Sequence, residues 1–298
     1  MEINKNITKN IKLIATDLDG TLLLPDKTLS AANKAALTWA AEEKGIYIAI
    51  ATGRPYFGIR KLLEWLPCVR YAVLSNGAVV QDTWTGEIIA KQLMKTEDAL
   101  AFYDYAVSQN LTVDFFDQGE RFVPPNWKEA VALMEASEGT KQLLISNCTI
   151  TKDQRARLAA AQGIEKISVR FRNGAQRNQF YSKFQEKFPQ LKVSTSLATN
   201  IETTDQGITK ETGLKNLASY LGLQMDEIMV FGDNENDREM IQAAGIGVVM
   251  GNASDEMKQI ADKITRNNTE DGVAYMVQEV LGWKQETLKS KLLHSVLF

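Results

Sequence analysis

Asp17 and Asp19 stand two positions apart in the segment 17–21 (DLDGT), just before a glycine. One carboxylate of such a pair can attack phosphorus as a nucleophile, and the other can give a proton to the leaving alcohol. The pair follows a short apolar run, 11–15, that predicts a buried strand. Because ligands of open α/β sheets bind at the carboxyl ends of strands, this position favours chemistry. The alternative is an acidic turn beside a glycine.

A second polar motif follows the next predicted strand, 46–51, where Thr52 and Gly53 precede Arg54. A threonine hydroxyl can bind a phosphate oxygen, and the backbone N–H groups beside a glycine are free to do the same. The alternative interpretation makes Thr52 the N-cap of a helix that begins at Pro55.

A third motif, 231–237 (FGDNEND), ends the predicted strand 228–231. Its carboxylate and amide oxygens suit a hard cation such as Mg²⁺, and it lacks the twelve-residue spacing of a calcium EF-hand loop. The alternative is the polar first turn of a helix, where aspartates are favoured. Lys210, at the start of a predicted helix 210–221, can neutralise phosphoryl charge.

Alternating strands and helices position these motifs. Apolar periodicity predicts a helix over 30–44, another from Pro55 to near residue 67, and a strand at 71–74. The same alternation returns near residue 197, with the elements 210–221, 228–231, 235–244, 246–249 and 255–261. This order predicts a parallel sheet, and the carboxyl ends of parallel strands meet at one edge. The three motifs and Lys210 are therefore expected to converge.

The stretch from residue 78 to about residue 195 contains none of these residues. A hairpin is predicted at 79–89 with its turn near Thr85, followed by helices and strands that include strands at 143–146 and 167–171. Its size fits an inserted domain. We therefore predict an α/β protein with a discontinuous parallel-sheet core, residues 1–81 and 197–298, interrupted by a mixed α/β insert, 82–196.

The composition excludes several classes of function. The 298 residues carry a net charge of −3, so there is no basic footprint for nucleic acid or for anionic membranes. Residues 1–12 lack the apolar run of a signal peptide, and no apolar stretch is long enough to span a bilayer. Cys68 and Cys148 lie far apart, which fits a reducing compartment, and we expect a cytoplasmic protein. The single histidine, His294, argues against histidine-based chemistry.

The order DLDGT, TGR, lysine and GDNEND resembles the four motifs of the haloacid-dehalogenase (HAD) superfamily. Their spacing resembles the Cof-type phosphatases, which carry a large type IIB α/β cap between the second and third motifs. Further segments similar to that subfamily are 75–78 (SNGA), 249–253 (VMGNA), 258–262 and 268–273. The resemblance implies a Rossmann-like HAD core, and a cap over 82–196 that determines substrate specificity.

The resemblance also implies a Mg²⁺-dependent phosphatase that works through a phospho-aspartate. Asp17 would be the nucleophile and Asp19 the general acid and base. Asp17, the main-chain carbonyl of Asp19 and Asp233 would bind Mg²⁺, and Asp237 would support the metal. We expect crowding by Asp17 and the phosphate to raise the pKa of Asp19 toward the working pH, although the metal opposes that shift.

The same resemblance implies that Thr52, Gly53, Lys210 and Asn236 bind the transferring phosphoryl group. The family places glycine after the motif lysine, whereas Glu211 stands there in this chain.

Two other functions remain open at this point: a phosphomutase on the same fold, and a non-catalytic sensor of a phosphorylated metabolite. A sensor would be favoured by the loss of the nucleophile or of a metal ligand, and none is lost. The expected substrate is a small phosphorylated metabolite: a sugar phosphate, a nucleotide or a phosphorylated cofactor. Candidate specificity residues in the insert are Phe115, Phe116, Asp117 and Arg170. The sequence fixes neither the substrate nor the oligomeric state.

Overall fold

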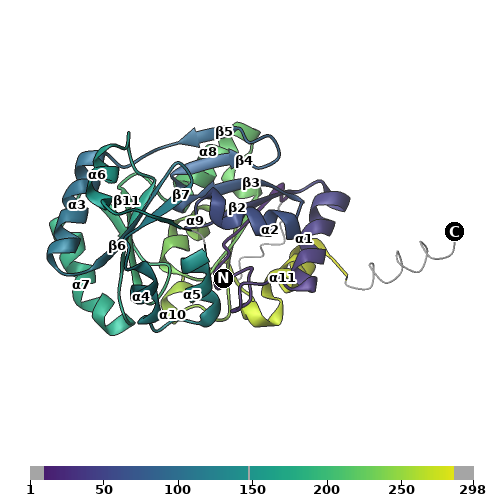
Figure 1. Cartoon of the computed structure of the whole chain (residues 1–298). Helices are drawn as coiled ribbons and strands as arrows, with labels where there is room; N and C mark the ends of the chain where they lie inside the picture. Colours follow the sequence, from purple (N-terminus) through teal and green to yellow (C-terminus); the bar gives the residue numbers. More distant parts are fainter. Residues whose placement is uncertain (1–9, 147, 285–298) are drawn as a thin grey trace.

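The computed structural model describes residues 10–146 and 148–284, which form two β-sheets flanked by helices (Figure 1). Residues 1–9, residue 147 and residues 285–298, which include His294, lie outside the described residues. No helix in the described part is both long and apolar enough to cross a bilayer.

The first sheet has eight strands in the order β14-β13-β12-β1-β2-β3-β4-β5. Neighbours from β14 to β3 run parallel, whereas β4 and β5 form an antiparallel hairpin at the edge. The bounds are β1 (Leu13–Thr16), β2 (Tyr47–Ala51), β3 (Val69–Leu74), β4 (Val79–Asp82), β5 (Ile88–Lys91), β12 (Ile228–Gly232), β13 (Ile246–Val249) and β14 (Lys263–Ile264). This sheet confirms the predicted α/β class.

Helices cover both faces of the first sheet, because alternate residues of each strand point to opposite sides. Ile14 of β1 packs in the apolar cluster of α1, α2 and α11, whereas Leu13 and Ala15 pack in that of α8, α9 and α10. These helices are α1 (Ala31–Lys44), α2 (Arg60–Trp65), α8 (Lys210–Leu221), α9 (Arg238–Ala243), α10 (Asp255–Lys258) and α11 (Gly272–Leu281). Short 3-10 turns are η1 (Tyr56–Ile59), η2 (Ser75–Gly77), η3 (Met225–Glu227), η4 (Glu235–Asp237) and η5 (Asn268–Glu270).

Local capping sets the ends of the two helices whose predicted bounds agree best with the structure. The Ser30 side chain accepts a hydrogen bond from the N–H of Asn33 at the start of α1, and Gly45 ends the helix with a left-handed φ of 66°. At α8, Thr209 forms a capping box with Thr212. The predicted helix 210–221 is thereby confirmed.

The second sheet has six strands in the order β10-β11-β9-β6-β7-β8. Its apolar face packs against α3, α6 and α7, and α4 and α5 form a smaller apolar cluster with β7. The strands are β6 (Thr112–Asp117), β7 (Glu120–Val123), β8 (Thr149–Ile150), β9 (Lys166–Arg170), β10 (Leu191–Ser194) and β11 (Asn200–Asp205). The helices are α3 (Thr96–Ser108), α4 (Trp127–Ala132), α5 (Glu138–Ser146), α6 (Gln154–Ala159) and α7 (Gly174–Lys187).

One predicted strand is wrong: residues 143–146 form the last turn of α5. Leu144 is buried there beside Trp127 and Met134, so helix packing satisfies the apolar run. The predicted hairpin at 79–89 is confirmed, but β5 lies beyond residue 82 and still pairs in the first sheet. Similarly, β11 lies beyond residue 196 and pairs in the second sheet. The division 1–81, 82–196 and 197–298 stays a prediction, and sheet membership favours boundaries after β5 and after β11.

Candidate active site

The three polar motifs lie at one edge of the first sheet. Asp17 follows β1, Thr52 follows β2 and Asp233 follows β12, and these three strands are parallel neighbours. Backbone bonds continue just past the strands, with the N–H of Asp17 donating to the carbonyl oxygen of Phe231 at 2.9 Å. The loops that leave the strands therefore bring the three side chains into one region.

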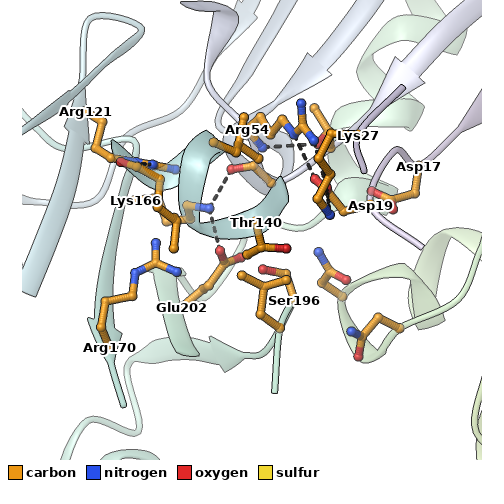
Figure 2. A pocket seen from close by; sticks show the side chains of 17 residues that line it. Asp17, Asp19, Lys27, Arg54, Arg121, Thr140, Lys166, Arg170, Ser196 and Glu202 are labelled. Carbon is orange, nitrogen blue, oxygen red and sulfur yellow. Dashed lines mark hydrogen bonds and ion pairs between the residues drawn. The ribbon is translucent and has the colours of Figure 1, made fainter. Parts of the chain in front are cut away.

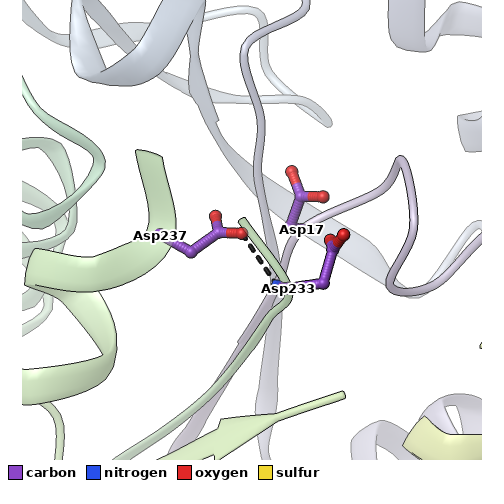
Figure 3. A group of neighbouring side chains, drawn as sticks. All are labelled: Asp17, Asp233 and Asp237. Atoms are coloured by element: carbon purple, nitrogen blue, oxygen red, sulfur yellow. Dashed lines mark hydrogen bonds between the residues drawn. The ribbon is translucent and has the colours of Figure 1, made fainter. Parts of the chain in front are cut away.

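Asp17, Asp233 and Asp237 form a carboxylate cluster whose oxygens lie within 4.8 Å of one another (Figure 3). The Thr21 hydroxyl donates to Asp233 Oδ1 at 2.8 Å, and the N–H of Asp233 donates to Asp237 Oδ2 at 3.0 Å. Burial raises the pKa of Asp17 to about 7, and the neighbouring carboxylates add to that rise. Burial and repulsion from Asp17 also raise the pKa of Asp233. An all-oxygen set of crowded carboxylates fits Mg²⁺, which would relieve this repulsion.

Lys210 joins the cluster from the first turn of α8. Its ammonium group is buried and donates to Asp17 Oδ1 and Asp237 Oδ1, both at 2.6 Å. Burial disfavours the ammonium, but Asp17 and Asp237 outweigh this and raise the pKa of Lys210 above its usual range. Glu211 does not disturb the helix start, because it turns toward Lys215 and forms an ion pair with it. Both oxygens of Asp237 are already engaged, which suits a supporting role better than direct metal ligation.

Asp19 lies in an ion pair that the sequence analysis did not anticipate. Arg54 Nε and Nη2 each donate to the Asp19 carboxylate at 2.7 Å, and Lys27 Nζ lies 2.7 Å from the same group. Burial would raise the pKa of Asp19, but Arg54 and then Lys27 outweigh it and hold this pKa well below its usual range. The expected upward shift is therefore wrong for this arrangement, because two cations occupy the side chain.

Thr52, Gly53 and Asn236 lie beside this ion pair. The Thr52 hydroxyl accepts a hydrogen bond from the N–H of Arg54 at 3.2 Å, and η1 begins only at Tyr56, so Thr52 is not its N-cap. The Gly53 carbonyl accepts from Lys166 Nζ at 2.5 Å. The Asn236 amide donates to Asn76 Oδ1 at 3.0 Å. These three of the four phosphate-site candidates line the same cavity.

A cavity of about 50 Å³ lies between the two sheets (Figure 2). Its first-sheet side is lined by Asp17, Asp19, Lys27, Thr52, Gly53, Arg54, Asn234 and Asn236. The opposite side is lined by Arg121, Thr140, Leu143, Leu144, Lys166, Arg170, Ser196, Leu197 and Glu202. Lys210, Asp233 and Asp237 lie outside the lining. Lys210 contacts the lining residue Asp17, Asp237 accepts a hydrogen bond from the N–H of the lining residue Asn234, and Asp233 precedes Asn234 in the chain. The structure thus brings all the predicted site residues to this cavity or into contact with its wall.

Of the four candidate specificity residues in the insert, Arg170 lines the cavity. Phe115 packs in the apolar core, and Asp117 pairs with Arg157 at 2.6 Å. Phe116 lies behind the wall, with Lys166 Nζ 4.6 Å from its ring centroid. Arg121, Lys166 and Glu202 also line the cavity and were not among the residues predicted from the sequence. The signal for the latter two was polar residues alternating with apolar ones in the strands KISVR (166–170) and NIETTD (200–205).

Comparisons with known proteins extend over nearly the whole chain. A family model described as haloacid dehalogenase-like hydrolase matches residues 14–277. The chain is 31% identical over 269 residues to 5-amino-6-(5-phospho-D-ribitylamino)uracil phosphatase YcsE of Bacillus subtilis (strain 168), covering 90% of this chain and 95% of that protein. A solved haloacid dehalogenase-like hydrolase of B. subtilis superposes with a TM-score of 0.80 at 28% identity, covering 90% of this chain and 99% of that one. A HAD subclass IIB sugar phosphatase shares the fold, with a TM-score of 0.76 at 23% identity and coverage of 91% and 99%.

Proposed function

The chain belongs to the haloacid dehalogenase-like hydrolase family, and we propose that Asp17 is its nucleophile and that Mg²⁺ is its metal. The protein is a phosphatase, as its relatives are. The observation that supports the assignment to Asp17 is its position: it lines the cavity while contacting Lys210 and lying within the carboxylate cluster. The substrate would be a small phosphorylated metabolite that fits between the two sheets.

The reaction proceeds in two steps. Asp17 attacks phosphorus, the ester P–O bond breaks, and the leaving oxygen takes a proton from Asp19. Asp19 then accepts a proton from a water molecule as the water oxygen attacks phosphorus. The bond between phosphorus and Asp17 breaks, which releases phosphate and restores the Asp17 carboxylate. Thr52, Gly53, Lys210 and Asn236 bind the phosphoryl oxygens. Because Arg54 and Lys27 hold Asp19 as a carboxylate, substrate binding must separate it from them, and Asp19 must take up a proton from solvent before it can donate one.

Asp17, Asp233 and the main-chain carbonyl of Asp19 would hold Mg²⁺, with Asp237 supporting them. The ion would supply positive charge that offsets repulsion between the phosphate dianion and the Asp17 carboxylate. The phosphatase relatives favour hydrolysis over the phosphomutase alternative, and the complete set of nucleophile and metal ligands favours catalysis over sensing.

The second sheet and its helices, from the end of β5 to the end of β11, would form the specificity cap. Sugar phosphates, nucleotides and phosphorylated cofactor precursors are the substrate classes to screen. The substrate named for YcsE, 5-amino-6-(5-phospho-D-ribitylamino)uracil, belongs to the last of these classes and is included in the screen. Cys68 and Cys148 are free thiols, which supports a cytoplasmic location.

The test is phosphate release from an aryl phosphate with Mg²⁺, with a chelator, and by Asp17→Asn. We expect chelation to abolish turnover and Asp17→Asn to lower it by at least about 10³-fold, because the covalent step is lost. Asp104→Asn is the matched control: Asp104 lies on α3, pairs with exposed Arg155, and should be neutral. Wild-type turnover by Asp17→Asn would refute the assignment.

A further inference from the structure

Five charged side chains line or adjoin the cavity from the second sheet, and we refer to them as the cap cluster: Asp114, Arg121, Lys166, Arg170 and Glu202. Their strands place apolar residues on the face that packs against α3, α6 and α7, so the charged residues take the opposite face. Each is at most 9% exposed. Burying so many charges is costly unless each is paired, so the pairing is informative.

Four members of the cap cluster are paired. Arg170 makes two hydrogen bonds to Asp114, at 2.7 and 2.8 Å. Lys166 Nζ lies 2.8 Å from Glu202 Oε1. Each of these carboxylates therefore already has a cation at hydrogen-bonding distance.

Arg121 is the member without a partner of its own. Its Nε lies 3.4 Å from Asp114 Oδ2, the carboxylate that Arg170 already holds, and its Nη1 lies 3.4 Å from the Leu144 carbonyl. The Nε is buried and has no hydrogen-bond partner among the described residues. Burial lowers the pKa of Arg121 to about 10, and Arg170 adds to that shift, yet the group stays charged at neutral pH.

Three cations thus face two carboxylates in the cap cluster, so its five buried side chains together carry one net positive charge. A water or a carbonyl could satisfy the N–H group of Arg121, but it would not offset the charge. An anionic group with acceptor oxygens would do both. Figure 2 shows Arg121 and Arg170 across the cavity from Asp17, where the far end of a bound phosphate ester would lie.

We propose that Arg121, with Arg170 beside it, binds a second acidic group of the substrate. The preferred substrates are then phosphate monoesters whose leaving group carries a carboxylate or a second phosphate. This inference rests on the proposed function, because it assumes that the ester is cleaved at Asp17.

The test compares esters that differ only in the second acidic group. The first pair is 6-phosphogluconate, which has a carboxylate at C1, and sorbitol 6-phosphate, which has an alcohol there. The second pair is fructose 1,6-bisphosphate and fructose 6-phosphate, which differ in a second phosphate. We expect the wild-type enzyme to favour the more acidic member of at least one pair about 10- to 100-fold in kcat/KM, the range for a charged hydrogen bond. The two pairs distinguish a carboxylate from a phosphate.

Arg121→Gln should bring that ratio close to one, and Arg121→Lys should retain part of it because the charge remains. Arg155→Gln, which replaces an exposed side chain of α6, should keep the wild-type ratio. A wild-type ratio near one in both pairs, with aryl phosphate still hydrolysed, would overturn this inference and leave the proposed function standing. Failure to hydrolyse the aryl phosphate and all four esters would overturn both. A folded Arg121→Gln variant that keeps the wild-type ratio would also overturn this inference. The wild-type ratio remains a test if that variant does not fold.

Discussion

Replacing Lys210 with methionine would test the electrostatics of the site most directly. Methionine keeps the apolar stem but leaves Asp17 and Asp237 without their cation, inside a cluster whose oxygens lie within 4.8 Å. Removing one partner of a buried ion pair costs about 3–5 kcal/mol in the free energy of unfolding. For a chain of 298 residues that corresponds to a melting temperature lower by roughly 5–8 °C.

The assay is thermal unfolding at pH 8 in chelator, repeated with Mg²⁺ and at pH 6. Mg²⁺ should restore more stability to Lys210→Met than to the wild type, because the ion replaces the missing positive charge. The deficit should shrink at pH 6, because burial already raises the pKa of Asp17 and protonation removes the repulsion.

Lys215→Met is the matched control on the same helix. Lys215 is 55% exposed and pairs with Glu211 at the surface, so its loss should cost no more than about 0.5 kcal/mol. Equal melting temperatures for the two variants in chelator would refute the reasoning. So would a Mg²⁺ effect on Lys210→Met no larger than that on the wild type.

Two further predictions concern the metal site. Gly20 has a φ of +95°, and a Cβ there would lie 2.3 Å from Asp233 Oδ2. Gly20→Ala should therefore displace Asp233 and weaken Mg²⁺ binding, measured by calorimetry, at least about tenfold. A variant that binds Mg²⁺ with the wild-type affinity would contradict this. Because the pKa of Asp17 is raised to about 7, Mg²⁺ must displace a proton below that pH, and its affinity should fall from pH 8 to pH 6. A flat affinity profile over that range would show that Asp17 is not protonated there.

The site motifs were predictable because each follows a strand whose apolar run is unmistakable. Once β1, β2 and β12 are parallel neighbours, their carboxyl ends must meet. Helix α8 was predictable to the residue because Thr209 caps its start and Gly222, with a φ of 67°, ends it. The apolar runs and the capping residues lie within or next to the elements that they define, so they can be recognised from the sequence alone.

The features that the sequence did not predict correctly all depend on contacts between residues far apart in the chain. Residues 143–146 read equally well as strand or helix, and only packing against Trp127 decides for the helix. The hairpin β4–β5 has the same local pattern whichever sheet it joins. The pairing of Asp19 with Arg54 is likewise non-local, because a long cationic side chain has several carboxylates within reach and the sequence does not choose among them.

The small cavity has a kinetic consequence. At about 50 Å³ it is well below the roughly 300–1,000 Å³ of typical ligand sites, so the described conformation is closed. Buried contacts hold the sheets together, including Lys166 with the Gly53 carbonyl and Asn76 Nδ2 with Glu202 Oε2 at 2.7 Å. Each catalytic cycle must break them twice, once to admit the ester and once to release phosphate. We therefore expect the rate of opening to limit kcat, and solvent viscosity to slow turnover of good and poor leaving groups alike.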